Sequence, residues 1–179
     1  MGTSSRLPSR QQVTQVYAII VLLLYGWTML WFLWKLPSWL GFLTVGEILT
    51  VLAYSLSTNF VESLAALCVP VAFALILPRA WFRDAFVARG ATMMIASLGA
   101  LMLAAGNFRN RDELPYLLVG AWRPALVLLG IAAAAFLAGH VGKLRGLVEA
   151  LADRATIFLY AALPLSILSI LVIAARWAL

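Results

Sequence analysis

Residues 38–77, SWLGFLTVGEILTVLAYSLSTNFVESLAALCVPVAFALIL, carry the pattern that decides the fold. The stretch is apolar almost throughout, and as one helix it would be about 60 Å long. The hydrocarbon core of a bilayer is about 30 Å thick, so this stretch is about twice as long as an ordinary membrane span. The stretch therefore predicts helical structure in a membrane. It is too long to form one ordinary span.

Polar side chains recur in the first part of this stretch at steps of three and four residues. They are Thr44 and the six residues that we call the polar stripe, namely Glu47, Tyr54, Ser55, Thr58, Asn59 and Glu62. The opposite face carries large apolar side chains, among them Phe42, Leu49 and Phe60. This separation of polar from apolar residues predicts an amphipathic helix.

The composition of the whole chain also indicates a membrane protein. Of the 179 residues, 64% are hydrophobic and only 11% are charged, and the mean hydropathy is +0.99. A soluble domain has about a quarter of its residues charged, because it must cover its surface with groups that water solvates. We therefore expect an all-α fold, a polytopic transmembrane helical bundle that forms a single domain.

The remaining sequence divides into apolar runs separated by short polar segments. Residues 1–12 are polar and are expected to form a cytoplasmic tail, and residues 13–179 a single transmembrane helical domain. The expected spans are residues 13–34, 60–77, 87–105, 116–138 and 155–176. Each has about the 20 apolar residues that a helix needs to cross the hydrocarbon core.

Two arrangements of residues 39–57 are compatible with the polar stripe. In the first, they form an interfacial helix along the membrane surface, and residues 60–77 alone span the membrane. In the second, both halves span the membrane, and the polar stripe faces the interior of the bundle.

The basic residues of the loops favour the first arrangement. With five spans, the side of the N-terminus holds eight of the 13 basic residues, namely Arg6, Arg10, Arg79, Arg83, Arg89, Lys143, Arg145 and Arg154. With six spans, the two cationic loops move to the side opposite the N-terminus. Because cytoplasmic loops carry an excess of Lys and Arg, we expect about five spans in a cell membrane such as a bacterial inner membrane, with the N-terminus cytoplasmic and the C-terminus outside.

The sequence contains none of the motifs that usually carry chemistry. There is no glycine-rich nucleotide loop, no His-Glu-x-x-His, no Cys-x-x-Cys and no Gly-x-Ser-x-Gly. One histidine and one cysteine leave too few ligands or nucleophiles for a metal site or a triad. We therefore expect no catalytic residues and no bound metal, and we favour a protein that is not an enzyme.

Glu47, Asn59 and Glu62 are the strongest functional candidates, and two interpretations of them remain open. A carboxylate at membrane depth is energetically costly and commonly serves an ion path, a proton relay or a contact with a partner. Alternatively, Glu47 lies at the water interface and Glu62 in the first turn of a span, where a carboxylate complements the helix dipole.

The segment that follows the fourth expected span holds three further candidates. His140 is the one residue that could ligate a haem or chlorin pigment, although a histidine at the interface is the more ordinary interpretation. Lys143 and Arg145 could contact the anionic headgroups of membrane lipids. A nucleic-acid partner is not expected, because no basic patch is interleaved with exposed aromatic residues.

Small residues at four-residue spacing, such as Ala96, Ala100 and Ala104, allow helices to approach closely, within this bundle or against another subunit. The favoured function is a non-catalytic integral membrane subunit, scaffold or assembly factor of a larger membrane complex. Its partners would be lipids and either other subunits or further copies of the chain. A small oligomeric transporter or channel that uses Glu47, Asn59 and Glu62 is the alternative, and a membrane enzyme that binds lipid headgroups is a further alternative.

Overall fold

A computed structural model describes residues 8–108 and 122–178, and its described elements are all helices. Five long helices follow one another along the chain: α1 (Arg10–Trp39), α2 (Val45–Ile76), α3 (Phe86–Phe108), α5 (Trp122–His140) and α6 (Gly142–Ala178). Two short 3₁₀ helices, η1 (Arg79–Trp81) and η2 (Arg83–Ala85), connect α2 to α3. The predicted all-α membrane helical bundle is thereby confirmed.

Within the described residues, four helices are long and apolar enough to cross a membrane. They cover Arg10–Trp39, Val45–Ile76, Arg79–Ala105 and Gly142–Trp177, and Leu126–His140 is a shorter apolar helix. The expected spans 13–34, 87–105 and 155–176 each fall within one of these helices. The expected span 60–77 lies within α2 except for its last residue. The expected span 116–138 begins outside the described residues, and its described part belongs to α5.

The helix break expected between residues 57 and 60 is absent from the structure, so the expectation of a separate helix over residues 39–57 is wrong, and its position at the membrane surface stays a prediction. Helix α1 ends at Trp39, and α2 then continues without a break from Val45 to Ile76. The sequence between the two expected halves contains neither glycine nor proline, so nothing in it interrupts the backbone hydrogen bonds. The amphipathic half of α2 packs along α1 and α6, and these tertiary contacts hold it in the bundle.

The cationic segment before the last expected span, which carries Lys143, Arg145 and Arg154, is likewise part of a helix. We call this segment the cationic connector. Helix α6 has 37 residues and would be about 55 Å long, so it includes both the connector and the expected last span. Pro164 lies inside it, as Pro37 lies inside α1 and Pro70 inside α2. A proline within a helix removes one backbone hydrogen bond and favours a local bend, yet each of these helices continues past its proline.

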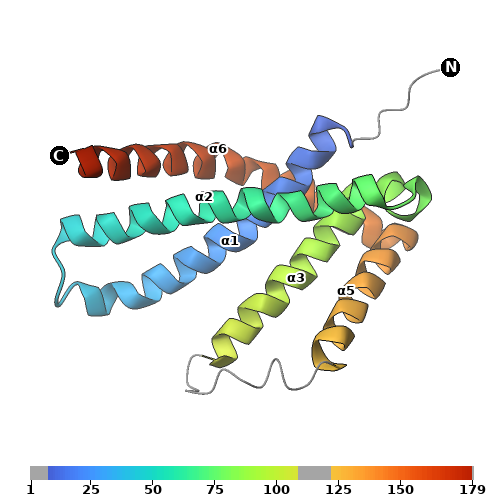
Figure 1. Ribbon diagram of the computed structural model, residues 1–179, viewed down its shortest axis with the longest axis horizontal. Coiled ribbons are helices and arrows are strands. Elements are labelled where there is room, and N and C mark those ends of the chain that lie inside the picture. The colour runs from blue at the N-terminus through green and yellow to red at the C-terminus, as the bar shows by residue number, and fades with distance from the viewer. Residues whose placement is uncertain (1–7, 109–121, 179) are drawn as a thin grey trace.

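The helices form two groups that meet around the first half of α1. Helices α1, α2 and α6 pack side by side, and α3 packs against α5 as a second pair (Figure 1). Figure 1 also shows that this pair diverges from the other three helices. The core lies where the groups meet, around Val16, Ile19 and Ile20 of α1 and Phe86 of α3, which are almost completely buried.

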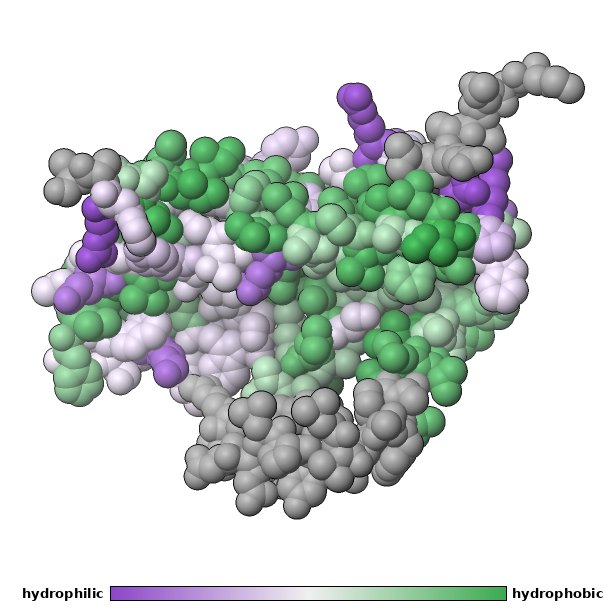
Figure 2. Space-filling view, in the orientation of Figure 1, coloured by the Kyte–Doolittle hydropathy of each residue, from purple (hydrophilic) through white to green (hydrophobic). Residues whose placement is uncertain are grey.

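Apolar side chains also cover much of the outer surface. Leu101 and Leu103 of α3 and Ile157, Phe158 and Leu168 of α6 are all more than half exposed. Figure 2 shows the same distribution as broad hydrophobic areas, together with a paler area over the left part of α1 and α2. An apolar outer surface of this extent is what a bilayer solvates and water does not.

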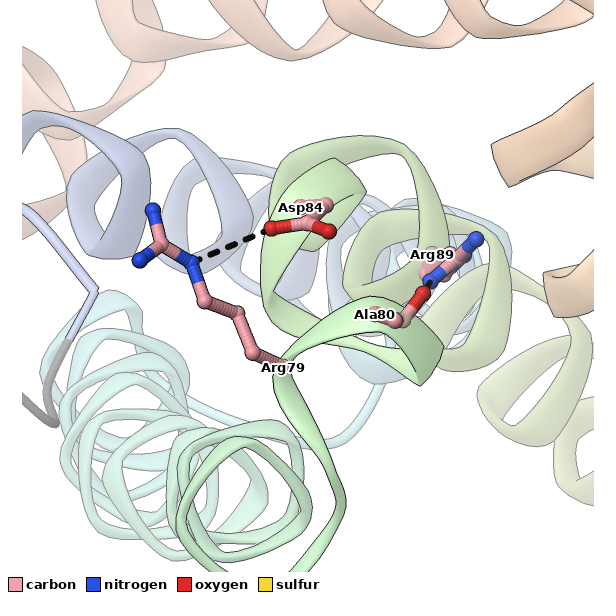
Figure 3. A network of polar contacts seen from close by, with 4 residues as sticks. All are labelled: Arg79, Ala80, Asp84 and Arg89. Atoms are coloured by element: carbon pink, nitrogen blue, oxygen red, sulfur yellow. Dashed lines mark hydrogen bonds and ion pairs between the residues drawn. The ribbon is translucent and has the colours of Figure 1, made fainter.

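A buried arginine ties α3 to α5 and to the turn before α3. Arg89 is 5% exposed, and its Nη1 donates a hydrogen bond of 2.9 Å to the carbonyl oxygen of Ala80. Nearby, Arg79 forms an ion pair of 3.2 Å with Asp84 (Figure 3). The backbone of α5 passes so close to Arg89 that a Cβ at Gly139 would collide with its Nε and lie 2.9 Å from its Cγ. Glycine therefore permits the close approach of α5 to α3.

Candidate functional site

Five of the six residues of the polar stripe line one groove on the surface of α1 and α2. We call this hollow of about 360 Å³ the polar groove; its lining consists of Thr28 of α1 with Tyr54, Ser55, Thr58, Asn59 and Glu62 of α2. The spacing of three and four residues brings these side chains to one face of α2. Tyr54 is also held by the end of α6, because Trp177 Nε1 donates a hydrogen bond of 3.2 Å to its hydroxyl.

Asn59 is the buried member of the polar groove, with 4% of its surface exposed. Its Oδ1 accepts a hydrogen bond of 3.0 Å from the Thr28 hydroxyl. Its Nδ2 is buried and has no hydrogen-bond partner among the residues that the structure describes. A buried donor left without an acceptor costs about 1–3 kcal/mol. This donor lies at the buried base of the groove, so a partner reaches it only if neighbouring side chains move.

Glu62 is the exposed, charged member of the polar groove. Helix α2 begins at Val45 and ends at Ile76, so Glu62 lies near its middle. The interpretation that Glu62 belongs to the first turn of a span is therefore wrong. The side chain is exposed, and the ion pairs within the described part of the chain do not include it. A carboxylate halfway along a membrane helix is costly unless a polar partner or water meets it.

Glu47 has a different role and lies apart from the polar groove. It occupies the first turn of α2, where its Oε2 accepts a hydrogen bond of 2.8 Å from the backbone N–H of Thr44. The backbone N–H of Glu47 donates in return to the Thr44 hydroxyl at 3.4 Å. Such a capping box satisfies backbone donors at a helix start. Glu47 therefore caps the start of α2. About 22 Å of helix separates it from Glu62.

A second hollow adjoins the polar groove and shares Thr28 and Ser55 with it. This hollow of about 310 Å³, which we call the tryptophan–lysine pocket, is lined by Trp27, Thr28, Trp31, Phe32, Lys35, Trp39 and Ser55. A further hollow of about 250 Å³ joins three of these residues to Ala105 of α3, and so extends the pocket toward α3.

From the sequence alone, these aromatic residues and Lys35 match only the pattern of an interfacial belt at the end of a membrane helix. The available signal was the four-residue spacing of Trp27, Trp31, Lys35 and Trp39, which brings all four to one face of α1. The rings of Trp27 and Trp31 pack edge to face, with centroids 5.5 Å apart. Phe32 and Trp39 pack at the same centroid distance, so the walls of the pocket are held by ring contacts.

Four polar residues of the bundle form two hydrogen-bonded pairs between helices. The hydroxyls of Tyr17 and Ser63 lie 3.1 Å apart across α1 and α2, and those of Tyr25 and Ser166 form a hydrogen bond across α1 and α6. Each serine also donates to a carbonyl oxygen of its own helix. These contacts join the three helices and satisfy their own hydroxyls, whereas the polar groove lies on the outside of the bundle.

The candidates near the start of α6 lie apart from both hollows. His140 Nδ1 lies 3.0 Å from the carbonyl oxygen of Phe136, and the two rings stack with centroids 4.0 Å apart. Arg145 is paired with Glu149 at 2.9 Å, and Lys143 is exposed. Pigment ligation by His140 and headgroup binding by Lys143 and Arg145 stay predictions. The described residues contain no group of three or more acidic, histidine or cysteine side chains placed to hold a metal ion.

Comparison with protein-family models, with curated proteins and with solved structures finds no match to this chain. The functional argument therefore rests on the two adjoining hollows of α1 and α2.

Proposed function

We propose that this chain is a non-catalytic integral membrane subunit, scaffold or assembly factor of a larger membrane complex. In this proposal, the polar groove receives a polar side chain from a transmembrane helix of another protein. The observation that supports it is the position of Glu62, which lies near the middle of α2 and is exposed on the outside of the bundle.

The free energy of a carboxylate in lipid favours such a partner. An acidic residue at the centre of a membrane helix costs about 2.5–3.5 kcal/mol on scales from insertion experiments. A donor on a neighbouring helix would offset part of this, because hydrogen bonds between membrane helices contribute about 0.6–2 kcal/mol each. The exposed carboxylate of Glu62 is the acceptor that the groove offers to such a donor.

An oligomeric transporter or channel is the second candidate, because polar side chains line the whole groove. The groove lies open on the outer surface of α1 and α2, so one copy would not enclose a polar path by itself. A path would require a second copy whose groove faces the first. The two candidates therefore differ in the identity of the neighbour.

Purification in a mild detergent, followed by quantitative mass spectrometry, tests the proposal. We expect a different membrane protein to co-purify in a fixed ratio with the wild-type chain, and to be lost from the Glu62→Leu variant. Leu64→Ala is the matched control, since Leu64 is exposed at nearly the same depth outside the groove. A chain that purifies only with copies of itself would contradict the proposal and support the second candidate.

A further inference from the structure

We infer that the tryptophan–lysine pocket binds the anionic headgroup of a membrane phospholipid. This site is separate from the contact proposed for Glu62, and the inference does not depend on the proposed function. It rests on three features of the described residues: the single cation in the pocket, its position along α1, and the extension of the pocket toward α3.

Lys35 is the charged residue of the pocket, and the other lining residues are aromatic or carry a hydroxyl group. It is exposed, and no acidic residue within the described ranges lies within salt-bridge distance of it. The hydroxyl of Thr28 already donates to Asn59, and that of Ser55 to the carbonyl oxygen of Val51. The ammonium group of Lys35 is therefore the charged donor that the pocket offers, and a phosphate oxygen is a fitting acceptor.

Glu62 does not supply the missing counter-ion, because it lies too far away along the bundle. The hydrogen bond between Thr28 and Asn59 places these two residues at the same height along the antiparallel helices α1 and α2. Lys35 lies seven residues after Thr28 in α1, and Glu62 lies three residues after Asn59 in α2. Because the two helices run in opposite directions, these steps lead away from each other. At 1.5 Å per residue, about 15 Å of helix separates the two charges. Glu62 therefore lies beyond salt-bridge distance of Lys35 along the bundle.

The position of the pocket places it where lipid headgroups lie. Lys35 is one turn from Trp39, the last residue of α1, and therefore close to the end of this membrane helix. Tryptophan rings concentrate at the level of the headgroups, and lysine side chains there extend toward phosphate. The apolar walls of the pocket also reduce local screening by water, which strengthens the attraction between an ammonium group and a phosphate.

The extension toward Ala105 makes a lipid a better occupant than a free anion. The adjoining hollow between Trp27, Trp31 and Ala105 continues from the Lys35 end of the pocket to α3. An apolar extension of this kind can accept the first part of an acyl chain, for which inorganic phosphate has no equivalent. Among the residues that the structure describes, no acidic side chain lines either hollow, so these residues offer no partner to the amine of a zwitterionic headgroup.

Tryptophan fluorescence provides the test, since three of the seven tryptophans line the pocket. The purified chain would be reconstituted in phosphatidylcholine vesicles that contain a few mole per cent of brominated phosphatidylglycerol or brominated phosphatidylcholine. We expect brominated phosphatidylglycerol to quench with about a five-fold preference at equal mole fraction, the effect of one lysine near a phosphate. In Lys35→Gln this preference should disappear, and in Lys35→Arg it should persist.

Arg10→Gln is the matched control, because it removes one exposed positive charge at the end of α1 opposite the pocket. It should keep the preference for phosphatidylglycerol. Equal quenching by the two brominated lipids in the wild-type protein would overturn the inference. A preference that survives Lys35→Gln, or one that Arg10→Gln abolishes equally, would also overturn it, since the charge of the whole surface would then explain the result.

Discussion

At Gly139, the backbone of α5 passes directly beside the side chain of Arg89. We expect Gly139→Ala to push Arg89 aside, because the added Cβ would collide with Nε and lie 2.9 Å from Cγ and Cζ. The hydrogen bond from Arg89 to Ala80 would then weaken or break. Overpacking of this kind lowers the free energy of unfolding by about 1–3 kcal/mol. Thermal unfolding in detergent would measure the loss as a lower Tm.

Gly130→Ala is the control for this prediction, because Gly130 lies on the same helix and a Cβ there would meet nothing within 4 Å. Alanine forms helices more readily than glycine, so this variant should keep or raise the Tm. Equal effects of the two substitutions would show that Arg89 does not pack against Gly139 as described.

The two glutamates of α2 should respond in opposite ways to replacement by leucine. Glu47→Leu removes the carboxylate that completes the capping box with Thr44, so it should lower the Tm of the isolated chain. Glu62→Leu removes an unpaired carboxylate from the middle of the helix, so it should keep or raise the Tm. Thermal unfolding of both variants in one detergent tests this contrast. A clear loss of stability in Glu62→Leu would mean that Glu62 serves the fold of the chain itself.

The sequence predicted which residues of α2 share a face, but it did not predict their neighbours. Steps of three and four residues grouped Tyr54, Ser55, Thr58, Asn59 and Glu62, and these five line the polar groove. Thr28 escaped notice because its contribution depends on how α1 packs against α2. Lys35 was taken for a residue of the interfacial belt because the spacing of a single helix does not reveal a hollow between helices.

At the scale of the elements, the continuity of α2 is the main difference from the sequence prediction. Hydropathy and spacing predicted helix on both sides of residues 57–60, and this is confirmed. The break between them was predicted from the length of the stretch and from the loop charges, neither of which acts on the local backbone. Packing against α1 and α6 instead supports one helix with polar residues on part of its surface.

Proline substitutions test the continuity of α2. Ser57→Pro should destabilise the chain by about 3 kcal/mol or more, because proline removes a backbone hydrogen bond inside a helix and clashes with the preceding turn. Val45→Pro should be tolerated, since Val45 is the first residue of α2 and Thr44 before it is extended. Equilibrium unfolding of both variants in detergent would compare them. If Ser57→Pro were as stable as the wild-type chain, residues 57–60 would be a junction and not a helix interior.

At the scale of the whole molecule, the divergence of two groups of helices could not be derived from the sequence. Composition and span length predicted a membrane helical bundle, and the described helices confirm it. The pairing of α3 with α5 (Figure 1) depends on tertiary contacts, such as the close packing of Arg89 against Gly139. The side of the membrane on which each end lies stays a prediction from the loop charges.

The central claim is that the polar groove contacts a different membrane protein at the depth of Glu62. Thr58 and Leu64 are both exposed, and they point about 120° apart around the axis of α2. A photo-crosslinking amino acid placed at each position in living cells therefore compares the groove with another face of the same helix, about 9 Å further along its axis. We predict one discrete adduct with a different protein from position 58, absent from position 64 and lost in the Glu62→Leu background. Adducts only with lipid, or equal adducts from both positions, would contradict the claim.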